Sequence, residues 1–238
     1  MDIELYSGDT KAIISTQGGY VTNLSDSYGD VLFPKRLLQT KEGQEKLRGG
    51  SHVCLPNFGP GGDSGQDQHG YGRVSEWIVE ASDPTSAVLK HAGTGAYEGL
   101  VAELRYQVEE QELTSELILT NESEVPLRVA PAFHPYFAYK GDIEIDGEKK
   151  PLLDDFSEAV FVDGSKHIVR TGTRLLTLLS ENLPRWAQWT DQLGNYICVE
   201  PSQSGFAFSE DISRADELEP GETKTYRFVM GWSSPLEN

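Results

Sequence analysis

One histidine stands where it could transfer a proton. His134 lies between aromatic residues and two prolines, in the stretch Ala-Pro-Ala-Phe-His-Pro-Tyr-Phe at residues 130–137. An imidazole has an ordinary pKa of about 6.5, so a histidine held on stiff backbone can donate or accept a proton at neutral pH. The alternative is a half-buried histidine that closes the end of a strand. This stretch alone leaves both interpretations open.

A carboxylate, Glu200, is the second candidate for acid–base chemistry. It follows an apolar run at residues 196–199 (Tyr-Ile-Cys-Val) and precedes a proline. The run predicts a strand that carries Glu200 into the interior, whereas a glutamate before a proline at a strand end is usually exposed. A positioned acid or base accelerates a reaction by roughly 10² to 10⁴-fold.

A glycine-rich segment at residues 48–73 could bind a ligand. It contains eight glycines and two prolines, starts with Arg48 and ends with Arg73. Glycine allows close approach of the backbone to a ligand, and a guanidinium fork suits paired oxygen acceptors. A long stretch without periodicity is usually functional or disordered, and its interspersed aromatic and apolar residues favour an ordered functional loop. The alternatives are a linker between two domains and, for the arginines, ordinary surface positions.

The elements that would position these residues are short strands. Residues 101–109 and 113–120 alternate apolar and polar side chains, which predicts a hairpin turning near Glu110 and Gln111. Residues 127–133 predict the strand that delivers His134, and residues 40–47 a loop or one short helix. Many short strands indicate an all-β fold, either an antiparallel sandwich or a barrel. The other strands are expected at residues 3–6, 12–14, 20–24, 31–33, 143–145, 159–162, 174–179, 186–189, 196–200, 206–208 and 223–232.

Composition limits the classes of partner. The 238 residues carry 38 acidic and 20 basic side chains, a formal net charge of −18, which disfavours nucleic acid and anionic membranes. The acidic N-terminal residues are unlike a signal peptide, and no apolar stretch approaches the ~18 residues of a membrane span. We therefore expect a cytoplasmic protein that binds neither nucleic acid nor membrane.

Cysteine and histidine spacing argues against a disulfide framework and a metal centre. Cys54 and Cys198 form no Cys-x-x-Cys pair, so we expect two buried, reduced thiols. The sequence contains no His-x-His and no His-x-x-x-His, and a metal site is not predicted. His91 and His167 lie in polar stretches, where we expect solvated turns.

Several short motifs occur in order along the chain, from about residue 48 to 232. In this order they resemble the signature of the aldose 1-epimerase (mutarotase) family, particularly its glucose-6-phosphate 1-epimerase-like branch. Ser51-His52 stands where that branch usually has Ile-Pro, so His52 receives no role from the resemblance. The motifs are Arg48-Gly49-Gly50, Cys54-Leu55-Pro56-Asn57-Phe58-Gly59, His69-Gly70-Tyr71-Gly72-Arg73 with Trp77, His134-Pro135-Tyr136-Phe137, Cys198-Val199-Glu200-Pro201 and Leu218-Glu219-Pro220-Gly221-Glu222.

The resemblance implies a large antiparallel β-sandwich of the galactose mutarotase-like type. We expect one domain over residues 1–238, with a sugar-binding cleft on one sheet face and no metal or cofactor. Glu200 would be the general base and His134 the general acid, on opposite sides of a pyranose ring. The residues expected to bind the substrate are Arg48, His69, Arg73 and Tyr136. Trp77 and Trp189 also offer flat faces, but among these aromatic residues only Tyr136 is assigned to the site.

The expected function is that of an aldose 1-epimerase acting on a hexose or hexose 6-phosphate. Its partner would be a small-molecule sugar or sugar phosphate, and the protein a monomer or weak homodimer. One alternative is a non-catalytic carbohydrate-binding module of the same fold. Another is a glycosidase or lyase, which needs a second acid near Glu200; Asp191 and Glu158 are the candidates.

Overall fold

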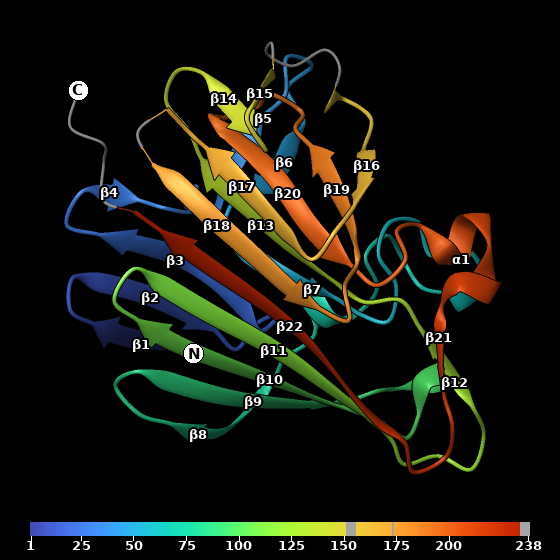
Figure 1. Cartoon of the computed structure of the whole chain (residues 1–238). Coiled ribbons are helices and arrows are strands. Elements are labelled where there is room, and N and C mark those ends of the chain that lie inside the picture. The colour runs from blue at the N-terminus through green and yellow to red at the C-terminus, as the bar shows by residue number, and fades with distance from the viewer. Residues whose placement is uncertain (151–155, 173, 234–238) are drawn as a thin grey trace.

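The computed structural model describes residues 1–150, 156–172 and 174–233, and it contains two large antiparallel sheets (Figure 1). The first sheet has nine strands in the order β1-β2-β3-β7-β13-β20-β19-β16, with β4 paired to β3. Its strands are β1 (Asp2–Ser7), β2 (Thr10–Ser15), β3 (Tyr20–Asp26), β4 (Gly29–Asp30), β7 (Ser51–Cys54), β13 (Ala132–Ala138), β16 (Val160–Asp163), β19 (Arg185–Trp189) and β20 (Tyr196–Ser202).

The second sheet also has nine strands, in the order β15-β14-β17-β18-β22-β11-β10-β9-β8. The predicted hairpin is confirmed: β10 and β11 pair along their whole length, and Gln111 in the turn has a φ of 61°. The strands are β8 (Ile78–Ser82), β9 (Ser86–Ala92), β10 (Leu100–Glu109), β11 (Glu112–Asn121), β14 (Ile143–Ile145), β15 (Glu148–Lys150), β17 (Lys166–Arg170), β18 (Leu175–Glu181) and β22 (Thr223–Trp232).

Smaller elements lie outside the two sheets. Two short strand pairs are formed by β5 (Arg36–Gln39) with β6 (Glu45–Arg48), and by β12 (Leu127–Val129) with β21 (Asp216–Leu218). No helix among the described residues is long and apolar enough to cross a membrane. The helical pieces are η1 (Gly62–Ser64), η2 (Gly72–Val74), η3 (Gly95–Tyr97), α1 (Ala207–Glu210) and η5 (Ile212–Arg214).

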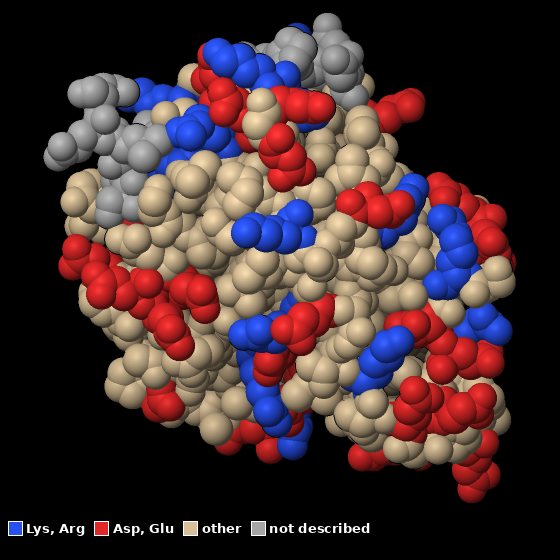
Figure 2. Space-filling view, in the orientation of Figure 1, with Lys and Arg blue, Asp and Glu red and all other residues tan. Residues whose placement is uncertain are grey.

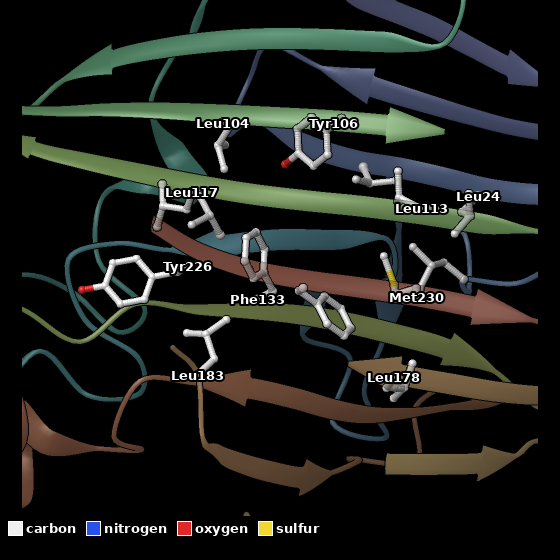
Figure 3. Packing of buried hydrophobic residues seen from close by; sticks show 14 of the residues in the cluster. Leu24, Leu104, Tyr106, Leu113, Leu117, Phe133, Leu178, Leu183, Tyr226 and Met230 are labelled. Carbon is white, nitrogen blue, oxygen red and sulfur yellow. The ribbon is translucent and has the colours of Figure 1, made fainter. Parts of the chain in front are cut away.

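The main hydrophobic core lies between the two sheets, which makes the fold the expected all-β sandwich. Apolar side chains at alternate positions of β10, β11 and β22 are buried there, including Leu104, Leu117 and Met230 (Figure 3). Across the interface Phe133 of β13 stacks on Phe228 with ring centroids 5.9 Å apart. Full burial of a side chain of this size contributes about 1.5–3 kcal/mol, so the alternating strands hold the two sheets together.

Several sequence-based predictions are wrong in detail. Residues 40–44 connect β5 to β6 by a turn in which Gly43 has a φ of 81°, and residues 45–47 belong to β6. Residues 206–208 form no strand; Ala207 and Phe208 belong to α1, and Phe206 precedes it. Three apolar residues in a row are too few to distinguish a helical turn from a strand. Of residues 31–33, only Leu32 forms a β-bridge, an isolated one with Phe137.

The two histidines expected in solvated turns lie in strands. His167 in β17 is buried, its Nδ1 is 2.6 Å from Oδ2 of Asp146, and its ring packs on Trp186. His91 in β9 is half-buried and its Nδ1 is 3.2 Å from the carbonyl oxygen of Glu76. The polar neighbours of both histidines point to the opposite side of their strands. From the sequence alone, a strand with such a polar face cannot be distinguished from a polar turn.

The glycine-rich segment at residues 48–73 is ordered and includes β7 at the centre of the first sheet, so it is not a linker. Close backbone packing requires a glycine at residue 70. Gly70 has a φ of 67°, and a Cβ there would lie 2.0 Å from the carbonyl oxygen of Leu55. The segment therefore folds back tightly over the sheet that contains β7.

On the face shown in Figure 2, basic side chains lie beside acidic ones. With a net charge of −18, the field of the whole chain repels polyanions.

Candidate active site

The central strands of the first sheet separate a core face from a site face. Successive side chains of a strand point to opposite sides. Val53, Phe133 and Val199 face the main core, whereas their neighbours His134 and Glu200 lie on the other side of the sheet. The apolar alternation that builds the sandwich thus also places the polar side chains together on its outer face.

His134 and Glu200 meet on this site face. In β13 and β20, Ala132 pairs with Ser202 and Tyr136 with Cys198, which sets residue 134 opposite residue 200. His134 Nε2 lies 3.5 Å from Glu200 Oε2, and the side chains are only 6% and 2% exposed. We expected the two groups on opposite sides of a sugar ring; they lie side by side instead, because they occupy neighbouring strands.

Burial controls the protonation of this pair. It raises the pKa of Glu200 well above its ordinary value of 4.5. It lowers the pKa of His134 well below 6.5, and the nearby imidazoles of His52 and His69 and the two arginines lower it further. Both shifts disfavour the charged forms, so burial favours the neutral form of the pair, a carboxylic acid beside a neutral imidazole.

The ring of His134 is held between two other rings. Tyr136, two residues further along the same strand, stacks on the ring of His134, with centroids 4.7 Å apart and an interplanar angle of 12°. His52, its register partner in β7, lies 4.8 Å away at 31°. No role was expected for His52, because the motif departs there from the family pattern. Only strand pairing places its ring beside that of His134.

His69 is fixed by the glycine-rich segment. The backbone N–H of Gly59 donates to its Nδ1 over 3.2 Å, so its proton is on Nε2. Burial, followed by the charges of Arg73 and Arg48, lowers its pKa to about 3. His69 is therefore a neutral imidazole at the cavity wall, and its Nε2–H can donate a hydrogen bond.

The two arginines differ in their partners. Arg48 forms an ion pair with Asp191 at 2.8 Å, and Asp191 also accepts a hydrogen bond from the hydroxyl of Tyr196. The guanidinium of Arg48 lies 5.5 Å from the ring centroid of Trp189. Arg73 forms no ion pair with any residue in the described part of the chain. Arg73 is therefore the cation with unused hydrogen-bonding capacity.

These side chains surround one cavity of about 250 Å³. All six residues predicted for the site line it. Trp189, which was considered but not assigned to the site, and Gln68, which the sequence did not single out, line it as well. Trp77 does not; it is buried in the core, and its Nε1–H donates to the carbonyl of Gly72. The complete set of lining residues is Arg48, Phe58, Gln68, His69, Arg73, His134, Tyr136, Ala159, Trp189, Glu200 and Phe206.

Glu200 is the one carboxylate among the described residues that line this cavity. Asp191, a candidate for a second acid, is engaged by Arg48, and Glu158 is exposed. A glycosidase needs two carboxyl groups flanking the scissile bond. The cavity therefore does not contain the pair of acids that a glycosidase requires, as far as the described residues define it.

The fold is that of the galactose mutarotase-like β-sandwiches. A galactose mutarotase related enzyme from Lactobacillus acidophilus has a TM-score of 0.80 at 16% identity, covering 100% of this chain and 99% of its own. A galactose mutarotase-like protein from Lactobacillus casei has a TM-score of 0.79 at 14% identity, covering 98% and 100%. A candidate aldose 1-epimerase from Escherichia coli has a TM-score of 0.80 at 16% identity, covering 98% and 99%.

A model of the aldose 1-epimerase family matches residues 1–163, which is more than half of the chain. The chain therefore belongs to the aldose 1-epimerase family, as the ordered motifs predicted. The matched part includes His134 and the glycine-rich segment, whereas Glu200 lies beyond it. No curated protein sequence matches the chain.

Proposed function

We propose that this protein is an aldose 1-epimerase that interconverts the α and β anomers of a hexose or hexose 6-phosphate. The observation that carries the proposal is the 3.5 Å contact between His134 and Glu200 at the wall of a cavity of about 250 Å³. A cavity of this size suits a single monosaccharide, since sites for larger ligands are typically ~300–1,000 Å³. The chain would act as one cytoplasmic domain without a cofactor.

The arrangement matches the chemistry of ring opening. The O1 hydroxyl must lose a proton while the ring oxygen O5 gains one, and the C1–O5 bond then breaks to leave an aldehyde at C1. Because O1 and O5 are bonded to the same carbon, an acid and a base that lie side by side can reach both. Rotation about C1–C2 and attack of the O5 hydroxyl on the other face of C1 close the ring as the opposite anomer.

The protonation of the pair is compatible with this cycle. The neutral pair and the ion pair, a Glu200 carboxylate with a His134 imidazolium, contain the same number of protons. A proton that moves from Glu200 to His134 creates the base for O1 and the acid for O5. In ring opening Glu200 takes the O1 proton and His134 gives its proton to O5, and ring closure reverses both transfers and restores the ion pair. The proton then returns from His134 to Glu200, so one turnover leaves the enzyme unchanged.

The unpaired guanidinium of Arg73 supports a phosphorylated substrate. A phosphate accepts two parallel hydrogen bonds from a guanidinium, and Arg48 is already engaged by Asp191. The net charge of −18 opposes the approach of an anion, so two local cations at the cavity would have to overcome a repulsive field. We favour the hexose 6-phosphate on this argument.

Polarimetry tests the proposal. Freshly dissolved α-glucose, α-galactose and α-glucose 6-phosphate are followed with the intact protein and with Glu200→Gln. We expect accelerated mutarotation of at least one sugar by the intact protein and loss of that acceleration in the variant. A rate equal to that of buffer for all three sugars, with sugar-dependent thermal stabilisation, would show a carbohydrate-binding module. An unchanged rate in Glu200→Gln would reject the mechanism.

A further inference from the structure

A buried cluster of three different donor groups lies at the wall of the cavity. Ligand atoms of His134, Cys198 and Glu200 all lie within 4.8 Å of one another, and all three side chains are buried. His134 comes from β13, and the other two come from β20, two positions apart on the same face of that strand. Neighbouring strands therefore bring together a nitrogen, a sulfur and an oxygen ligand.

The spacing of the nitrogen and oxygen ligands fits a tetrahedral ion. Two ligands bonded to zinc at about 2.1 Å in a tetrahedral site lie roughly 3.4 Å apart, and His134 Nε2 lies 3.5 Å from Glu200 Oε2. Glu200 Oε2 and His134 Nδ1 are buried atoms that have no hydrogen-bond partner among the described residues. The carboxylate thus has an unused acceptor in the cluster, and a buried polar atom without a partner is costly.

We propose that His134, Cys198 and Glu200 form a binding site for Zn²⁺ or a similar thiophilic divalent ion, with the fourth position open to the cavity. Thiolate, imidazole and carboxylate are the three ligand types that zinc uses in proteins. On binding, the thiol and carboxyl protons leave to solvent and are replaced by bonds to the ion. The ion enters by the same cavity that admits a sugar.

Bound zinc would inhibit the enzyme. It would occupy the Nε2 and Oε2 atoms that transfer protons, so a sugar and the ion could not use the pair at the same time. This consequence rests on the proposed function, whereas binding of the ion does not. The sequence predicted no metal site because spacing motifs detect ligands near one another in sequence, and here one ligand comes from a separate strand.

Cys54 provides a matched control. It is the other buried free cysteine, and its Sγ also lies near imidazole nitrogens, 3.5 Å from His69 Nδ1 and 3.8 Å from His52 Nδ1. It lacks a carboxylate in its cluster, and His69 Nδ1 already accepts a hydrogen bond from Gly59. Cys54 is therefore the competing location that an experiment must exclude.

Cobalt titration of the metal-free protein tests binding directly, because a thiolate bound to Co²⁺ gives a near-ultraviolet charge-transfer band. We expect a band that saturates at one cobalt per chain, disappears on addition of zinc, is retained in Cys54→Ser and is lost in Cys198→Ser. The Cys198→Ser change should weaken zinc binding by at least roughly 100-fold, beyond the usual effect of losing a supporting group. Absence of the band, or its loss in Cys54→Ser with retention in Cys198→Ser, would overturn the inference.

A second variant and a second readout complete the test. If near-ultraviolet circular dichroism shows that Cys198→Ser is unfolded, Glu200→Gln should keep the thiolate band but require about 10 to 100-fold more cobalt; unchanged affinity would overturn the inference. In polarimetry, zinc should inhibit the intact protein and Cys54→Ser but not Cys198→Ser. Absence of any mutarotation would reject the proposed function and leave the cobalt result standing.

Discussion

His134 and Glu200 face each other on neighbouring antiparallel strands, with Nε2 and Oε2 3.5 Å apart and both side chains nearly inaccessible to solvent. Their separation is set by the register of β13 and β20 and by the stacked rings of Tyr136 and His52. Because the pair shares one proton in a buried site, its protonation state is sensitive to pH and to the charge of a ligand.

The pH dependence of the epimerase rate should be bell-shaped. Activity requires one proton on the His134–Glu200 pair, so it is lost when the pair gains a second proton at low pH or loses its last proton at high pH. The lowered pKa of His134 places the acid limb below pH 6.5, and the raised pKa of Glu200 places the alkaline limb above pH 4.5. Polarimetric kcat/KM measured across pH checks this; an acid limb at or above pH 6.5 would contradict it.

Replacing Glu200 should reduce kcat by at least about 10²-fold, the contribution of one positioned acid–base group. Glu200→Gln keeps the size of the side chain but cannot accept the O1 proton. Glu158→Gln is the control, because Glu158 is exposed and is not among the lining residues of the cavity. Stopped-flow polarimetry at saturating sugar separates the two variants. Equal rates in Glu200→Gln and Glu158→Gln would remove Glu200 from the reaction.

Arg73→Gln should discriminate between a sugar and a sugar phosphate. A hydrogen bond to a charged group contributes about 1.5–3 kcal/mol, so KM for glucose 6-phosphate should rise by about 10 to 150-fold while KM for glucose changes little. Arg105→Gln, on the exposed face of β10 in the second sheet, is the control and should leave both KM values unchanged. Similar increases in KM for both substrates would show that Arg73 binds sugar hydroxyls and not phosphate.

The buried ion pair of Arg174 with Asp26 should be important for stability. The guanidinium binds both carboxylate oxygens, at 2.5 and 2.6 Å, and Trp232 of β22 also donates to Asp26 in β3, so the pair connects the two sheets. Asp26→Asn leaves a buried cation without its partner, and we expect a loss of about 3–5 kcal/mol in the free energy of unfolding. Asp163→Asn breaks an exposed pair with Arg185 and should cost less than about 1 kcal/mol. Urea unfolding curves compare the two.

The stabilisation by Asp26 should disappear in acid. Burial raises its pKa, but the hydrogen bonds from Arg174, Tyr28 and Trp232 outweigh this effect, and the pKa lies below 3.8. A carboxyl group whose pKa is lowered by folding stabilises the native state above its unfolded pKa, and that stability is lost as pH falls through the folded pKa. The difference in unfolding free energy between the intact protein and Asp26→Asn should therefore shrink below pH 3.8. A difference that is constant down to the acid unfolding transition would contradict this linkage.

Gly70→Ala should destabilise the protein more than Gly65→Ala does, although both glycines lie in the glycine-rich segment. The two glycines have nearly equal φ values, 67° and 65°, but a Cβ at Gly70 would lie 2.0 Å from the Leu55 carbonyl oxygen, whereas at Gly65 it would meet open space. We expect a cost of about 1–2 kcal/mol for Gly65→Ala from the left-handed backbone alone, and a larger cost for Gly70→Ala. Thermal unfolding measures both; equal losses would show that the close contact relaxes freely.

Part of this structure could be predicted because its signals are local. Alternation along residues 101–120 predicts β10 and β11, and the apolar run before Glu200 predicts a strand that enters the interior. Errors arose where the signal was short or mixed. Residues 207 and 208 lie in a helical turn and not in a strand. His167 is buried and contacts Asp146, although a solvated turn was expected there.

The supporting residues of the site were not predicted, because their partners are distant in sequence. His52 lies outside the family pattern, yet strand pairing sets it beside His134. Asp191 was a candidate acid, but Arg48, 143 residues away, neutralises it. Gln68 and Trp189 carry no motif and reach the cavity only because the glycine-rich segment and β19 lie next to the central strands.

The sequence by itself determined the all-β class, the family and the six side chains now found around one cavity, since these follow from local alternation and from short ordered motifs. Only the tertiary structure decided that His134 and Glu200 lie side by side, that Cys198 joins them, and that, of the two arginines at the cavity, Arg73 forms no ion pair with a described residue. The physical reason is that strand register and burial join residues distant in the chain. Register sets their distances, and burial sets their protonation.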